Sequence, residues 1–288
     1  MRTFPNFSAT VETMLPPTAT GTGNETLEVR LVVNESYSKL NKAMWECLNF
    51  IAKDEPGSTA AGHGGIHVGN ASAAHAIAGN NNDPEDKVAL NYHILLIENM
   101  NHYLEEVDSR SNPILQEWRS RASEDLASHL AQYTDAIIRR PLGKWLDFVE
   151  STEAMLKSVV NNNSLSSSFA DNPSSAGAAG ARSISLRPSH SRSTAKKILS
   201  TYDSKEIRKG VETLKKRIEK HFGDGDDMVL ARSLVGKVFA ECTVRYGEAW
   251  ERMRGLVERV YGGGGGEGGG GGLEIEWRKE EVGSLFKR

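Results

Sequence analysis

Residues 113–140 read PILQEWRSRASEDLASHLAQYTDAIIRR, and this stretch decides the fold class. Its apolar side chains recur every three or four residues, which is the spacing of one face of an α-helix. They are Leu115, Trp118, Ala122, Leu126, Leu130, Tyr133 and Ile137. Asn112 and Pro113 form a start signal, because a capping side chain precedes a proline whose missing N–H costs nothing at the first helical position. The stretch therefore predicts a long amphipathic helix.

The same spacing predicts further helices over residues 26–53, 84–107, 204–222 and 226–261. Their predicted core residues are Tyr37, Leu40, Met44, Leu48 and Ile51; Val88, Tyr92, Leu96, Met100, Tyr103 and Val107; Ile207, Val211, Leu214, Ile218 and Phe222; and Leu234, Val238, Cys242, Tyr246, Trp250, Met253, Leu256 and Val260. Asp203 and Glu206 resemble a capping box before the third of these helices, and Gly223 ends it. Because each apolar stripe covers one face, the helices must pack against one another.

Arg139, Arg140, Pro141 and Gly143 form a structural element in the middle of this pattern. A proline in a helix removes one backbone hydrogen bond and collides with the preceding turn. We expect a kink or break before residues 142–159, with a close helix approach at Gly143.

Four segments are rich in small or polar residues, and they divide the chain. Their side chains bury too little apolar area to offset an ordering cost of about 1–2 kcal/mol per residue. We predict a disordered N-terminus over residues 1–25, a helical bundle over 26–160 with a linker at 55–82, a disordered linker over 161–190, and a C-terminal bundle over 191–288 with a glycine tract at 262–272.

The last residues differ in pattern from the rest. Leu273-Glu274-Ile275-Glu276-Trp277 alternates like a short strand, and Lys279 to Phe286 could close the chain with a small helix. The predicted fold class is all-α: elongated, stacked antiparallel helical bundles with long flexible linkers and one short strand-like segment.

Composition excludes several classes of protein. The chain has 288 residues, a formal net charge of −3 and 38% apolar residues. Its longest aliphatic stretch is Ile94 to Ile97, far short of the roughly 20 residues that cross a bilayer. The first residues contain no apolar export signal, so we expect a cytoplasmic protein. Cys47 and Cys242 fit a reducing compartment, and we predict that both lie in the core.

Catalytic motifs give no convincing match. Ser193 and Lys196 satisfy SxxK without its companion motifs, and Ser193 is better explained as a helix N-cap. The glycine run from Gly262 follows a helix and precedes the strand-like segment, which is the reverse of the dinucleotide-binding order. His63, His67 and His75 lie in a glycine-rich segment unsuited to a metal site. We therefore predict no enzyme activity, no cofactor and no metal.

Charge gives the clearest functional signal. Residues 181–222 hold twelve Lys/Arg against four Asp/Glu. A basic amphipathic helix can bind anionic lipid head groups or an acidic partner helix, although a merely solvated face has the same pattern. The candidate partner- or lipid-binding residues are Lys196, Lys197, Lys205, Arg208, Lys209, Lys215, Lys216, Arg217 and Lys220. Nucleic acid is disfavoured because no aromatic side chains are interspersed in a suitable pattern and the net charge is negative.

Several strings resemble a known family. NYHILLIENMNHYLEEVD (91–108), DAIIRRPLGKWLDFVESTEAMLK (135–157), AKKILSTYDSKEIRKGVETLKKRIEKHF (195–222) and the closing stretch from Tyr261 through Val282 resemble the C-terminal helical region of the fungal exocyst subunit Sec-three, exocyst complex component one. The resemblance covers about residues 26–288 with gaps at the linkers. It departs at the expanded glycine tract, where the family has a short turn.

The resemblance implies an α-helical rod inside the hetero-octameric exocyst, which tethers secretory vesicles at the plasma membrane, and it implies no enzyme activity. The family's N-terminal lipid- and GTPase-binding functions are not carried over to these residues. Our leading interpretation is a noncatalytic exocyst subunit that contacts other subunits or membrane phosphoinositides at sites of polarised secretion. The alternative is a stand-alone helical module that adsorbs to anionic membranes. No small-molecule substrate is expected under either interpretation.

Overall fold

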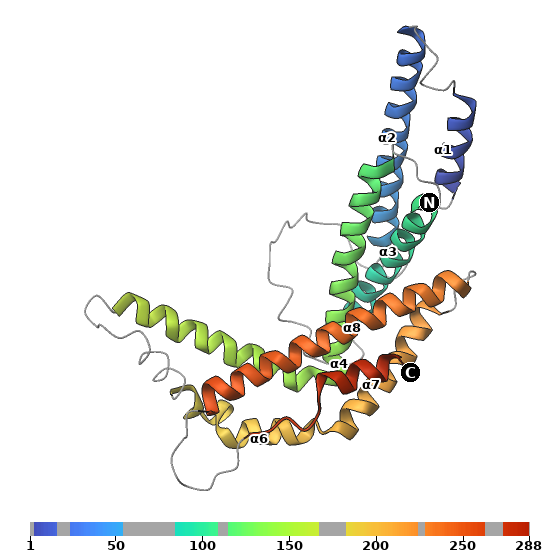
Figure 1. The fold of residues 1–288 in the computed structure, drawn as a ribbon. Coiled ribbons are helices and arrows are strands. Elements are labelled where there is room, and N and C mark those ends of the chain that lie inside the picture. The colour runs from blue at the N-terminus through green and yellow to red at the C-terminus, as the bar shows by residue number, and fades with distance from the viewer. Residues whose placement is uncertain are drawn as a thin grey trace. The chain divides into compact units, whose positions relative to one another are not determined.

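The computed structural model describes residues 3–15, 24–53, 84–108, 115–166, 183–223, 228–262 and 273–287 (Figure 1). Its helices are α1 (Thr3–Met14), α2 (Asn24–Lys53), α3 (Pro84–Asp108), α4 (Gln116–Ser166), α6 (Arg192–Thr201), α7 (Ser204–Phe222), α8 (Met228–Leu256) and α9 (Lys279–Lys287), with the 3-10 turn η3 (Pro188–His190) and the π-helical turn η4 (Val257–Tyr261). The described elements are all helical, so the predicted all-α class is confirmed.

The chain forms two compact units. Unit 1 comprises Met1–Tyr133 and His221–Leu234, and unit 2 comprises Thr134–Lys220 and Val235–Arg288. The divisions fall inside helices α4, α7 and α8. This differs from the predicted boundary at residues 161–190, because long helices can each contribute to two cores and low-complexity segments need not mark the border between them.

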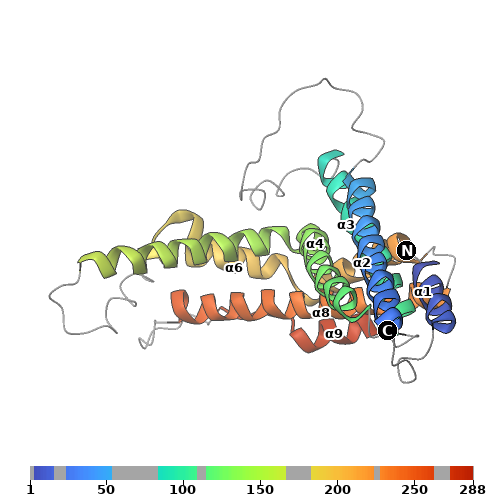
Figure 2. The same cartoon turned by 90° about the horizontal axis from the view of Figure 1, so that it is seen from above.

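The core of unit 1 is aromatic and lies between α2, α3 and the first part of α4, which lie side by side in both views (Figures 1 and 2). The ring of Trp45 meets the ring of Tyr103 edge-on, with centroids 5.5 Å apart. Trp45 Nε1 donates to Asp125 Oδ2 at 2.9 Å, and Tyr103 Oη donates to Asn41 Oδ1 at 3.1 Å. These polar partners satisfy groups that would be costly to bury unpaired.

The buried face of α2 agrees only in part with the predicted one. Leu40 is 43% exposed and Ile51 is 55% exposed, so their predicted place in the core is wrong. The predicted Tyr37 and Leu48 are buried and Met44 is half-buried, and the buried row is completed by Asn41, Trp45 and Ala52. Helix α2 carries two stripes at helical spacing, and periodicity alone does not say which stripe packs inside.

Helix α1 corrects the predicted disordered N-terminus for residues 3–14. Phe4 is buried with its ring edge-on to Tyr37, centroids 6.0 Å apart. Tyr37 Oη donates to the backbone oxygen of Ser8 at 3.1 Å, and Arg30 Nη1 pairs with Glu12 Oε2 at 2.6 Å. A helix this short is marginal alone, so these contacts with α2 stabilise it rather than its own propensity.

Trp145 is the centre of unit 2. Its Nε1 donates to the backbone oxygen of Ala249 at 3.1 Å, which joins α4 to α8. The Trp145 ring also lies 5.7 Å from the ring of Tyr202 and 5.4 Å from that of Trp277. The second part of α4 crosses α8 in Figure 1 and runs alongside it in Figure 2.

Residues 273–278 are not a strand, contrary to prediction. The alternation is real, since Glu274 and Glu276 are exposed and Trp277 is fully buried. Trp250 Nε1 donates to the backbone oxygen of Trp277 at 2.9 Å. The segment therefore lies with one side against helices, which produces the same alternation as a sheet without a neighbouring strand.

Part of the predicted linker 161–190 is ordered. Residues 161–166 complete α4, and residues 183–185 form a helical turn in which Ile184 is fully buried. The His190 ring stacks on Phe148 with centroids 5.5 Å apart, and Tyr261 Oη donates to the His190 backbone oxygen at 2.7 Å. Disorder is therefore the wrong prediction for residues 161–166 and 183–190. The predicted linker 55–82 and residues 263–272 of the glycine tract lie outside the described residues.

No helix within the described ranges is long and apolar enough to span a bilayer.

Candidate interaction surface

The start and the end of helix α7 agree with the signals in its sequence. The Asp203 carboxylate accepts a hydrogen bond from the Glu206 backbone N–H at 2.7 Å, so Asp203 is the predicted N-cap. The helix ends at Phe222 before Gly223, as predicted. Helix α6 is capped by Ser191, whose hydroxyl accepts from the Thr194 N–H, so the predicted cap at Ser193 is wrong by two residues.

The predicted apolar stripe of α7 is confirmed as its buried face. The buried residues are Ile207, Val211, Leu214, Ile218 and Phe222. Lys205, Lys209, Lys216 and Lys220 are exposed, and their spacings of four, seven and four residues place them on one face opposite to that stripe. We call these four residues the lysine stripe. Lys196 and Lys197 of α6 are exposed as well.

The other basic residues predicted on α7 have contacts within the fold. Arg208 Nη2 lies 3.4 Å from Glu281 Oε1 of α9. Lys215 Nζ donates to the backbone oxygen of Leu285 at 3.1 Å and lies 5.4 Å from the centre of the Phe239 ring. Arg217 is only half-exposed and also has an interaction partner. Arg208 and Lys215 therefore connect α7 to α9, and all three side chains are less available to a partner than the lysine stripe.

Within the lysine stripe, surface pairing is weak. Lys209 Nζ lies 4.0 Å from Glu206 Oε2, and both side chains are largely exposed. Lys205, Lys216 and Lys220 form no ion pair with the described residues. An exposed pair of this kind contributes about 0–1 kcal/mol, so the stripe can exchange it for an external anion at little cost.

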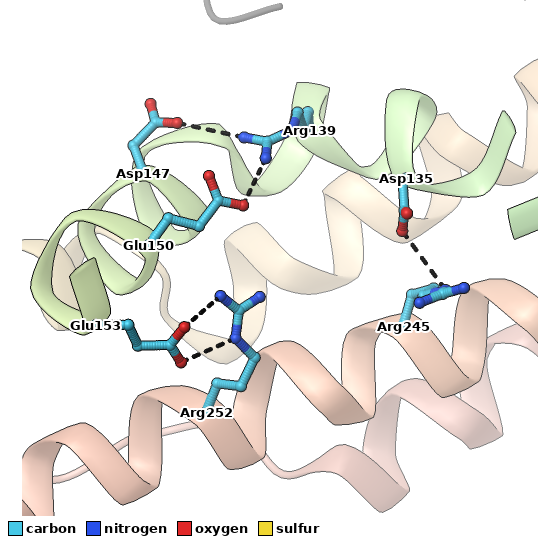
Figure 3. Close-up of polar contacts among 7 residues, drawn as sticks. All are labelled: Asp135, Arg139, Asp147, Glu150, Glu153, Arg245 and Arg252. Carbon is cyan, nitrogen blue, oxygen red and sulfur yellow. Dashed lines mark hydrogen bonds and ion pairs between the residues drawn. The ribbon is translucent and has the colours of Figure 1, made fainter. Parts of the chain in front are cut away.

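Arg139 lies at a bend of α4. Its Nη2 lies 2.5 Å from Glu150 Oε1 and its Nη1 lies 3.4 Å from Asp147 Oδ1 on the same helix (Figure 3). In a straight helix the α-carbons of residues 139 and 150 would be about 16 Å apart, beyond the reach of the two side chains. The helix therefore bends between them. Of the predicted kink or break, the kink is correct and the break is wrong, because α4 continues through Pro141.

Gly143 is not the site of a close helix approach. A Cβ built at Gly143 meets nothing within 4 Å, whereas one built at Gly210 of α7 would lie 3.1 Å from Pro141 Cβ. The glycine that allows close packing is therefore Gly210. Arg140 is exposed.

Two ion pairs between α4 and α8 were not predictable from the sequence. Arg252 forms two hydrogen bonds with Glu153, and Arg245 Nε lies 3.5 Å from Asp135 Oδ1 (Figure 3). The hydrogen bonds from Arg252 lower the pKa of Glu153. Helical spacing identifies neighbours on one helix, but it does not say which charges of two distant helices meet.

The rejected SxxK pattern lies in the first part of α6. The Ser193 hydroxyl lies 2.9 Å from that of Ser191, and Lys196 is exposed. His63, His67 and His75 lie outside the described residues, within which no group of three or more His, Cys, Asp or Glu could hold a metal ion. Cys242 is buried as predicted, and burial raises the pKa of its thiol to about 12. Cys47 is exposed, so its predicted place in the core is wrong.

Comparison with known proteins agrees with the resemblance read from the sequence. The family model described as "Exocyst complex component Sec3, C-terminal" matches residues 1–263. A mouse protein, exocyst complex component 1, is 20% identical over 170 residues, which is 59% of this chain and 16% of that relative. The match therefore spans about a sixth of the relative's length. No solved structure matches the chain. Because the family model covers most of the sequence, the chain belongs to the family of C-terminal regions of this exocyst component.

Proposed function

We propose that this chain is a noncatalytic part of the exocyst tethering complex and helps to dock secretory vesicles at the plasma membrane. The family match over residues 1–263 supports membership of the complex. Under this proposal the chain is cytoplasmic, associates with the membrane from its surface, and has the other exocyst subunits as its partners.

The lysine stripe is the observation that carries the proposed mode of binding. Four exposed lysines share the outer face of α7, and Lys196 and Lys197 are exposed on the preceding helix. A basic residue near an anionic membrane surface contributes about 1 kcal/mol to binding, and an acidic protein surface offers the same attraction. We assign the contact with acidic partner surfaces or phosphoinositides to these six residues. We assign Arg208, Lys215 and Arg217 a structural role instead.

A triple charge reversal tests this assignment. Lys205→Glu, Lys216→Glu and Lys220→Glu together should reduce the exocyst subunits that copurify with the chain from cells. The matched control reverses Arg140, Lys144 and Arg232, which are exposed and change the net charge equally. Equal recovery of exocyst subunits by both triple variants and the unmodified chain would remove the lysine stripe from the mechanism.

The same stripe also favours a second candidate, a helical module that binds anionic membranes without the complex. Sedimentation of the purified chain with phosphoinositide-containing vesicles separates the two functions. Binding that needs no other subunit and weakens with added salt, because salt screens exposed charges, supports the second candidate. Binding only when other exocyst subunits are present supports the first.

A further inference from the structure

Helix α2 carries a second apolar stripe that is not buried in unit 1. It comprises Val29, Ser36, Leu40, Ala43, Cys47 and Phe50, with the half-buried Val33 in the same row. Val29 is 50% exposed, Leu40 is 43% exposed and Phe50 is 66% exposed. We call this row the second stripe. It is separate from the buried row around Trp45.

The spacing of the second stripe is that of a coiled-coil seam. From Val29 to Phe50 its members alternate between steps of four and three residues once Val33 is included. This repeat keeps one row of side chains facing a partner helix along its length. A single exposed apolar residue needs no explanation, but a continuous row marks a surface for another helix.

Ser36 is the polar residue of the second stripe, and burying it leaves no hydroxyl group without a hydrogen bond. Ser36 Oγ donates to the backbone oxygen of Val32 at 2.7 Å, so its hydroxyl already has a partner within the helix. Cys47 and Ala43 are small, whereas Leu40 and Phe50 are large. The second stripe therefore contains large side chains that can insert into a partner helix and small ones that leave room for the partner's side chains.

We propose that the second stripe binds the second stripe of another copy of this chain, with the two α2 helices antiparallel. In one register Leu40 lies opposite Ala43 of the second copy, and Ser36 lies opposite Cys47. The same register puts Val33 opposite Phe50. The large Leu40 thus faces the small Ala43, and the twofold axis gives each contact twice.

The charges beside the seam select this register. Lys39 and Glu46 are one heptad apart and flank the second stripe on the same side. In the antiparallel pair, Lys39 lies opposite Glu46 of the second copy, which gives two symmetric ion pairs. A parallel pair would not bring these two side chains together across the seam.

Both charged side chains are available for this exchange. In the single chain, Lys39 Nζ lies 2.7 Å from Glu35 Oε1, and Lys42 Nζ lies 3.9 Å from Glu46 Oε1. The Lys39 side chain is 75% exposed and that of Glu46 is 69% exposed. Pairs this exposed contribute little to stability, so re-pairing across the dimer costs little.

Sedimentation equilibrium of the full chain over a range of concentrations tests the proposal. The unmodified chain should form a dimer, and Leu40→Glu should abolish it. Leu31→Glu is the matched control, because Leu31 is 66% exposed on α2 but lies off the second stripe. Lys39→Glu should weaken the dimer at least tenfold, and Lys39→Glu combined with Glu46→Lys should restore it.

A cysteine variant checks the register. Ser36→Cys puts a thiol opposite Cys47 of the second copy, so an added oxidant should convert the variant into a covalent dimer. The two positions are about 16 Å apart along one helix and cannot join within a chain. A full chain that stays monomeric at high micromolar concentration would overturn the proposal. Crosslinking of the unmodified chain through Cys47 to Cys47 would overturn the antiparallel register.

Discussion

Arg252 of α8 donates two hydrogen bonds to the Glu153 carboxylate of α4, from Nε to Oε1 at 3.0 Å and from Nη2 to Oε2 at 2.8 Å. Side-by-side bonds of this kind fix geometry as well as adding energy, because the planar guanidinium matches the carboxylate. The pair joins two helices of unit 2 that are distant in sequence. Its removal should therefore destabilise this unit more than removal of a pair within one helix.

Glu153→Gln should lower the free energy of unfolding by about 1 kcal/mol at pH 7, since hydrogen bonds to charged groups contribute about 1.5–3 kcal/mol and partial exposure reduces this. The bonds from Arg252 lower the pKa of Glu153 in the folded chain. A lowered folded pKa stabilises the fold above the ordinary carboxyl value of 4.5, and this contribution disappears as the pH falls through the folded pKa. Urea unfolding at pH 7 and pH 3.5 should show the difference shrinking.

Glu258→Gln is the control for this variant. Glu258 pairs with Arg254 four residues away on the same stretch of helix, and both side chains are more than half exposed. Loss of this pair should lower the free energy of unfolding by less than about 0.5 kcal/mol. Equal losses for the two variants would show that the Glu153–Arg252 pair has no special role.

Gly210 should be the glycine that resists substitution. A Cβ there would already lie 3.1 Å from Pro141 Cβ, so Gly210→Leu should overpack the bend of α4 and cost about 1–3 kcal/mol. Gly236→Leu meets open space in the interior of α8 and should stabilise by up to about 1 kcal/mol, because leucine is the better helix former. Thermal unfolding followed by circular dichroism measures both. The same sign for both substitutions would contradict the close contact.

The spacing of apolar residues predicted the buried face of a helix well where the helix has one apolar stripe. The prediction was poorer in α2, which has two stripes. In α8 the predicted residues Val238, Cys242 and Tyr246 are all buried. In α2 the predicted Leu40 is exposed, because it belongs to a second stripe at the same spacing as the buried one, and Ile51 is exposed as well. Nothing local in the sequence distinguishes them, since the choice depends on which face α3 and α4 cover.

Predictions about single residues were limited by contacts between distant elements. Gly143 is near Pro141 in the sequence, yet the close contact comes from Gly210 on another helix. Arg208 and Lys215 have the same charge as the lysine stripe, but α9 contacts them. Composition identified the basic helix, and only the fold separates its solvent face from the face that holds α9.

Lys215 and Lys216 should therefore differ although they are adjacent. Lys215→Ala loses the hydrogen bond to the Leu285 backbone oxygen and the contact with the Phe239 ring, and should cost about 1 kcal/mol. Lys216→Ala, at an exposed position, should change stability by less than about 0.5 kcal/mol. Chemical denaturation of both variants checks the difference. Equal stability would mean that Lys215 does not hold α9.

Trp277 should be among the most sensitive positions in unit 2, although it lies outside any helix. Its ring is fully buried against Trp145, with centroids 5.4 Å apart, and Tyr246, with centroids 6.4 Å apart. Trp277→Ala should cost about 3–5 kcal/mol, because it leaves a large cavity at the centre of the core. Glu276→Ala, one residue earlier and exposed, should change stability by less than about 0.5 kcal/mol. Guanidinium unfolding measures both, and a small loss for Trp277→Ala would mean that residues 273–278 are not docked in solution.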